Sequence, residues 1–88
     1  MNTIVETIVN DSYKVLELLY NNQVTVLNET FCPISQEQMA KELNVTRTTI
    51  STLLKKLKEN GLIEDYSQSK KYTLTQDGIK CVKTIKKL

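Results

Sequence analysis

The residues of this sequence best suited to chemistry form a polar series between positions 46 and 55. Its members are Thr46, Arg47, Thr48, Ser51, Thr52 and Lys55. From position 47 onward their spacing places them on one face of an α-helix. An arginine side chain can donate two hydrogen bonds to guanine, and hydroxyl and lysine groups contact bases and phosphates. The series therefore predicts a helix that reads duplex DNA, with Arg47 as the candidate for guanine.

A second polar group lies at the tip of a predicted β-hairpin and consists of Ser69, Lys70 and Lys71. Beside a DNA-reading helix, we expect these side chains to contact the DNA backbone. The alternatives are a solvated turn, or lysines that protect an edge strand from pairing. For Lys56 and Lys58 a structural reading is favoured, since cations near the C-terminus of a helix stabilise its dipole.

The sequence lacks the patterns of an enzyme. It has no histidine and only two glycines, and it contains no nucleophile motif or glycine-rich phosphate loop. Its two cysteines, Cys32 and Cys81, are far apart and outside any Cys-x-x-Cys pair. We therefore expect no catalytic residue, no metal site and no cofactor. The thiols are interpreted as free groups, one in a loop and one on a helix, with a redox pair that alters DNA affinity as the alternative.

Two helices joined by a short turn are predicted to position the polar series. Ser35 and Gln38 form a capping box that starts the first helix, and Thr46 caps the second, which Gly61 ends. Six apolar positions are expected to build the shared core of the helices and the turn. They are Met39, Ala40, Leu43, Val45, Ile50 and Leu53.

The flanking segments complete a single predicted domain over residues 1–88. Residues 1–22 are predicted to be helical, 35–60 to form the helix-turn-helix, 62–75 a hairpin in which Tyr66 pairs with Tyr72, and 76–88 a last helix capped by Thr75. Residues 23–34 leave a short strand or an apolar loop open, and Pro33 prevents a helix there. The predicted fold class is mainly α with a small β-hairpin, a winged helix-turn-helix flanked by N- and C-terminal helices.

The stretch MAKELNVTRTTISTLLKKLKENGLIEDY, followed by LTQDG, resembles the core of bacterial winged-helix regulators of the MarR type. This resemblance implies a dimeric transcription factor whose second motif helix enters the major groove, while the hairpin wing touches the minor groove or backbone. The sequence departs from that pattern at Asn44, where many relatives have glycine, and its wing lacks the usual Asp-x-Arg. The chain is also shorter than a typical MarR protein, whose long terminal helices form the dimer and a ligand pocket, so the resemblance identifies no small-molecule effector.

Charge is distributed unevenly along the chain. Residues 1–44 carry six acids and two bases, a net charge of −4, and residues 45–88 carry four acids and ten bases, a net charge of +6. A basic second half suits a polyanion. We therefore expect double-stranded DNA as the partner of a bacterial, phage or plasmid transcriptional regulator, with a winged-helix protein-interaction module or a replication or partition factor as alternatives. The sequence shows neither an export signal nor a membrane span, so we expect a cytoplasmic protein. The N-terminal apolar stripe of Ile4, Val5, Ile8 and Val9 is read as part of the core or, because so short a chain has little core to cover, as the contact surface of a homodimer.

Overall fold

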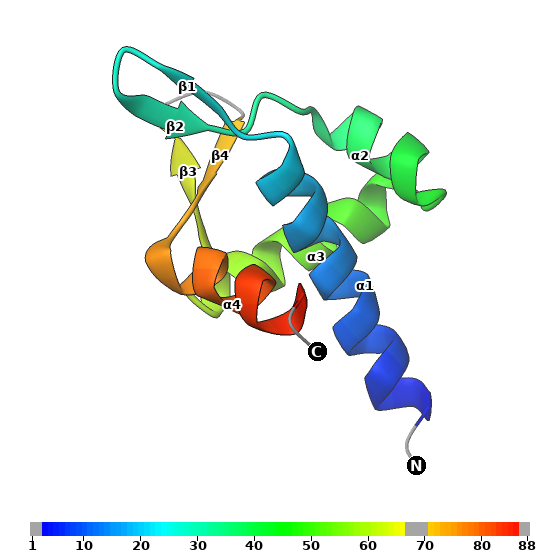
Figure 1. The fold of residues 1–88 in the computed structure, drawn as a ribbon. Helices are drawn as coiled ribbons and strands as arrows, with labels where there is room; N and C mark the ends of the chain where they lie inside the picture. Colours follow the sequence, from blue (N-terminus) through cyan, green and yellow to red (C-terminus); the bar gives the residue numbers. More distant parts are fainter. Residues whose placement is uncertain (1–2, 67–70, 87–88) are drawn as a thin grey trace.

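The computed structural model describes residues 3–66 and 71–86, and the side chains of residues 11–66 and 71–85. One helix, a pair of short strands, two helices, a second pair of strands and a last helix follow one another along the chain (Figure 1). The elements are α1 (Thr3–Asn21), β1 (Val24–Val26), β2 (Glu29–Phe31), α2 (Gln36–Leu43), α3 (Arg47–Glu59), β3 (Ile63–Tyr66), β4 (Lys71–Leu74) and α4 (Gln76–Lys86). The predicted fold class, helices with a winged helix-turn-helix, is confirmed.

The core lies where α1, α2, α3 and α4 meet the β3–β4 hairpin. Helix α1 contributes Val15, Leu16 and Leu19, which are fully buried because their spacing brings them to one side of the helix. The N-terminal half of α1 extends away from the other elements (Figure 1). The described core residues of α1 thus lie in the C-terminal half of this helix.

The helix-turn-helix forms as the sequence predicts. Ser35 and Gln38 make the capping box, and Asn44 ends α2 in the left-handed conformation at φ 56° and ψ 48°. Val45 is the exception, because it is 36% exposed rather than sealed in the turn. Its side chain lines a small depression together with Leu43 and Leu53.

The wing consists of β3 and β4, which pair antiparallel with Ile63 opposite Leu74 and Asp65 opposite Tyr72. The predicted pairing of Tyr66 with Tyr72 is wrong. Tyr66 lies opposite Lys71 instead, and since side chains alternate along a strand, the two tyrosines point to opposite faces of the hairpin.

Residues 23–34 contain a second hairpin, which settles the open choice between strand and loop. Strand β1 pairs with β2, and the turn residues Leu27 and Asn28 have positive φ angles of 52° and 69°. Cys32, expected in a loop, is buried and forms a β-bridge with Tyr72 of the wing. The two hairpins are therefore joined, and the β1–β2 hairpin lies beside the wing (Figure 1).

The start of α4 is hydrogen-bonded to the end of α3, at the base of the wing. The Thr75 hydroxyl accepts a hydrogen bond from the backbone of Gly78 at 3.0 Å and donates one to the carbonyl of Gly61 at 2.7 Å. Thr75 thus ties the first turn of α4 to the end of α3. Among the described residues, no helix is long and apolar enough to span a membrane.

Candidate nucleic-acid interface

Helix α3 has a buried apolar face and an exposed polar face. Ile50, Leu53, Leu54 and Leu57 are at most 7% exposed and anchor the helix in the core. All the predicted polar residues of this segment are exposed: Thr46, Arg47, Thr48, Ser51, Thr52 and Lys55. The fold therefore brings the polar series together on one solvent-facing surface, which we call the α3 face.

The leading end of α3 is built by its N-cap. The Thr46 hydroxyl accepts a hydrogen bond from the backbone of Thr49 at 3.1 Å, and the two hydroxyls lie 3.0 Å apart. The backbone amides of Arg47 and Thr48 belong to the first turn, where an α-helix has no partner for them within itself. With no acidic residue in that turn, this end of the helix suits an anion such as phosphate.

The side chains of the α3 face differ in how far the protein already engages them. The Thr52 hydroxyl donates to the backbone carbonyl of Thr48 at 3.0 Å, which leaves its oxygen as an acceptor. Within the described part of the chain, Arg47 forms neither a salt bridge nor a side-chain hydrogen bond. Its guanidinium is therefore available to a ligand.

Lys58, near the other end of α3, has a role within the fold. Its ammonium lies 3.0 Å from a carboxylate oxygen of Asp65 and 5.9 Å from the centre of the Tyr72 ring. The Tyr72 hydroxyl in turn accepts a hydrogen bond from the side-chain amide of Gln36 at 3.0 Å. These contacts join α2, α3 and the wing, so Lys58 has a structural role through Asp65 and Tyr72. Its expected interaction with the helix dipole stays a prediction.

The predicted wing residues are described only in part. Lys71 begins β4, opposite Tyr66, and is half-buried. Ser69 and Lys70 lie outside the described residues. Their predicted contact with the DNA backbone therefore stays a prediction.

Sequence reasoning missed the residues of β2 that contact the side of the wing facing away from α3. The ring of Phe31 in β2 stacks on that of Tyr66, with centroids 4.7 Å apart and an angle of 19° between the planes. The Thr73 hydroxyl donates to the carbonyl of Thr30 at 2.9 Å. In the sequence, only the short apolar stretch around Val24 and Val26 indicates a strand here, and it does not indicate the partner of that strand.

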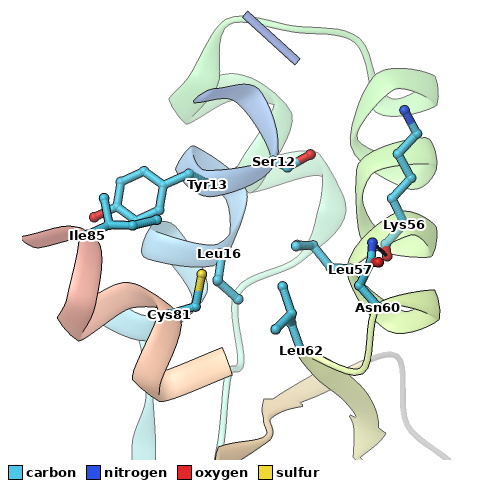
Figure 2. A pocket seen from close by; sticks show the side chains of 9 residues that line it. All are labelled: Ser12, Tyr13, Leu16, Lys56, Leu57, Asn60, Leu62, Cys81 and Ile85. Carbon is cyan, nitrogen blue, oxygen red and sulfur yellow. Dashed lines mark hydrogen bonds between the residues drawn. The ribbon is translucent and has the colours of Figure 1, made fainter. Parts of the chain in front are cut away.

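An apolar cavity of about 290 Å³ opens between α1, α3 and α4 (Figure 2). Leu16, Leu57 and Leu62 form much of its wall, and Lys56 and Asn60 lie at the α3 side. Cys81 also lines it, whereas Cys32 is buried elsewhere, and both thiols are free. Within the described residues, no cluster of side chains could hold a metal ion.

The helix-turn-helix, its wing and the exposed α3 face define a class of DNA-binding domains. The chain belongs to the family of Crp-like helix-turn-helix domains, whose model matches residues 14–76. No curated protein sequence matches the chain.

The structure is also similar to crystal structures of MepR, a transcription regulator of the multidrug efflux pump MepA of Staphylococcus aureus. MepR itself matches with 30% identity and a TM-score of 0.67 over 89% of this chain. The S. aureus MepR–DNA complex matches with 29% identity and a TM-score of 0.69 over the same share. These similarities confirm the predicted MarR-like winged-helix fold. The chain spans about half the length of the MepR chains, 55% and 54% respectively.

Proposed function

We propose that this protein is a transcriptional regulator that binds double-stranded DNA sequence-specifically through the α3 face. The observation that carries the proposal is the exposed leading end of α3, where Arg47 has no partner in the described structure and the first-turn amides face solvent. The similarity to MepR, for which a DNA complex is known, supports the same conclusion.

In this proposal α3 lies in the major groove, where some of its residues contact bases and others contact phosphates. Arg47 donates two hydrogen bonds to guanine, and Thr48, Ser51 and Thr52 meet neighbouring base edges. The hydroxyl of Thr46, the amides at the start of α3 and the ammonium of Lys55 bind phosphates. The wing adds backbone contacts from Ser69, Lys70 and Lys71.

We further propose that the protein acts as a homodimer in the cytoplasm, as one winged-helix domain without enzymatic activity. The N-terminal half of α1 extends beyond the fold (Figure 1). Its sequence continues an apolar stripe through Ile4, Val5, Ile8 and Val9. A second copy of α1 would cover such a stripe. Size-exclusion chromatography with light scattering tests this, and a monomer at all concentrations contradicts it.

The test of DNA binding begins with fluorescence anisotropy on a mixed pool of duplexes. If a dimer neutralises about six phosphates, the logarithm of affinity should fall with the logarithm of salt concentration at a slope of roughly −5. Arg47→Ala should weaken binding by about 1–3 kcal/mol.

Lys83→Ala is the matched control, because Lys83 is an exposed base of α4 outside the α3 face. It should bind as the parent does. Absence of binding by the parent to any duplex at low salt would contradict the proposal and favour a protein-interaction module. Equal losses in Arg47→Ala and Lys83→Ala would mean that α3 has no special role.

A further inference from the structure

The β1–β2 hairpin contacts mainly the wing. All three residues of β1 are exposed, and Leu27 at the turn is 91% exposed. The inner contacts come from β2 and the residue after it, where Phe31 stacks on Tyr66 and Cys32 bridges to the wing. Because the β1–β2 hairpin is mostly exposed, we expect its main structural effect to be on the wing that it contacts.

Three kinds of contact hold β2 against the wing. The backbone amide of Cys32 donates to the carbonyl of Tyr72 at 2.7 Å, and the Thr73 hydroxyl donates to the carbonyl of Thr30 at 2.9 Å. The Phe31 and Tyr66 rings stack at 4.7 Å. Desolvation, followed by the negative charge of Glu29 and a hydrogen bond to it, raises the pKa of Tyr66, so the Glu29 carboxylate lies beside the Tyr66 hydroxyl.

The opposite side of the wing is held by the helix-turn-helix. Lys58 of α3 pairs with Asp65 and lies over Tyr72, and Gln36 at the start of α2 donates to the Tyr72 hydroxyl. The wing is thus clamped between α3 and β2. An isolated two-stranded hairpin of four-residue strands is marginally stable in water, so its packing against neighbouring elements matters. The wing packs against α3 on one side, and on the other the bridge between Cys32 and Tyr72 joins it to the β1–β2 hairpin.

We propose that Phe31, together with Thr30, is a positioning residue for the wing: β2 fixes the orientation of the β3–β4 hairpin relative to α3. This proposal rests on the proposed DNA-binding function. With β2 in place, Lys71 at the start of β4 is held at a fixed position relative to the α3 face. Without it, the wing pivots on its α3 contacts and its share of the phosphate contacts falls.

The experiment uses the full chain and two readouts. The first needs no DNA: hydrogen exchange of the backbone amides of β3 and β4, with the amides of α2 and α3 as the internal reference. The second is the affinity for a duplex pool and its salt dependence. Phe31→Ala should speed wing exchange while α2 and α3 stay protected, and should weaken binding about two- to ten-fold, the range of an aromatic pair. Its salt slope should become shallower by about one per lost phosphate contact.

Two variants control for general damage to the fold. Phe31→Tyr keeps the ring and should restore both readouts, whereas Leu27→Asn changes the same hairpin at its exposed turn and should alter neither. Thr73→Val removes the hydroxyl that donates to Thr30 without removing bulk, so it should shift both readouts in the same direction as Phe31→Ala by a smaller amount.

The outcomes separate this proposal from the function on which it rests. Unchanged hydrogen exchange of the wing amides in Phe31→Ala overturns the claim that β2 stabilises the wing. Faster wing exchange with unchanged affinity and salt slope overturns the positioning role. If the parent binds no duplex, the DNA-binding function is overturned. If hydrogen exchange in Phe31→Ala then rises only in the wing, the stabilisation of the wing by β2 is still supported.

Discussion

Gly78→Ala should destabilise the protein although alanine is the better helix former. Gly78 lies in the first turn of α4 and is buried against the backbone of Leu62. An added Cβ would overlap the carbonyl oxygen of Leu62 and lie 3.1 Å from its carbon. That carbonyl also accepts the amide of Thr75 at 3.1 Å. Relief therefore requires α4 to move relative to the root of the wing, since a backbone carbonyl cannot swing aside as a side chain can.

The magnitude follows from two opposing effects. Overpacking of this kind costs about 1–3 kcal/mol, and the gain in helix propensity from glycine to alanine offsets up to about 1 kcal/mol. We expect a net loss of about 1–2 kcal/mol in the free energy of unfolding. In a domain of this size that lowers the melting temperature by about 5–15 °C. Urea and thermal denaturation followed by circular dichroism measure both quantities.

Gly61 provides the matched control, because it is restricted by its backbone and not by space. Its φ is +71° and no atom lies within 4 Å of an added Cβ. Gly61→Ala should cost about 1–2 kcal/mol, and Gly61→Asn less, because asparagine tolerates the left-handed conformation. At position 78 asparagine should be no better tolerated than alanine. Gly78→Ala with a stability equal to or above that of the parent would refute the close approach of α4 to Leu62.

Two further predictions concern the N-cap and the buried thiol. Thr46→Ala should lower the free energy of unfolding by about 1 kcal/mol, because the first turn of α3 loses its side-chain acceptor, while Thr46→Ser should retain it; equal denaturation curves for all three proteins would contradict the cap. Burial raises the pKa of the Cys32 thiol from its ordinary 9.0 to about 11, so the folded state holds this proton more tightly, and the resulting stability is complete below pH 9 and is lost as pH rises toward 11. At pH 10 the loss is about 1.4 kcal/mol, which urea titrations should find in the parent and not in Cys32→Ala; matching pH dependence in the two proteins would disprove it.

The helix-turn-helix could be predicted because its signals are local. The capping box from Ser35 to Gln38, the cap at Thr46 and the left-handed positions Asn44 and Gly61 each depend on neighbours within one turn. The apolar stripes of α2 and α3 then fix which faces are buried. The exposed α3 face follows from these choices, and the position of Arg47 at the start of α3 follows with it.

The second hairpin could not be predicted, because its contacts are distant in sequence. Its strands have three residues each, and its turn carries Leu27 and Asn28 instead of a glycine pair. The partner of Phe31 is Tyr66, which lies in the wing. The wrong pairing of Tyr66 with Tyr72 has a different origin. It lies within one hairpin, where one residue of register decides the face to which a strand side chain points.

The most direct test of the account is the base preference of Arg47 variants. The parent and Arg47→Ala would each select duplexes from a random pool, and the selected sequences would be compared position by position. The account predicts that the alanine variant loses its preference for guanine at one position of each half-site and keeps the others, and that Arg47→Lys restores it only in part, because an ammonium lacks the two-pronged geometry. Identical preferences in the parent and the alanine variant would contradict the claim that α3 reads DNA through Arg47.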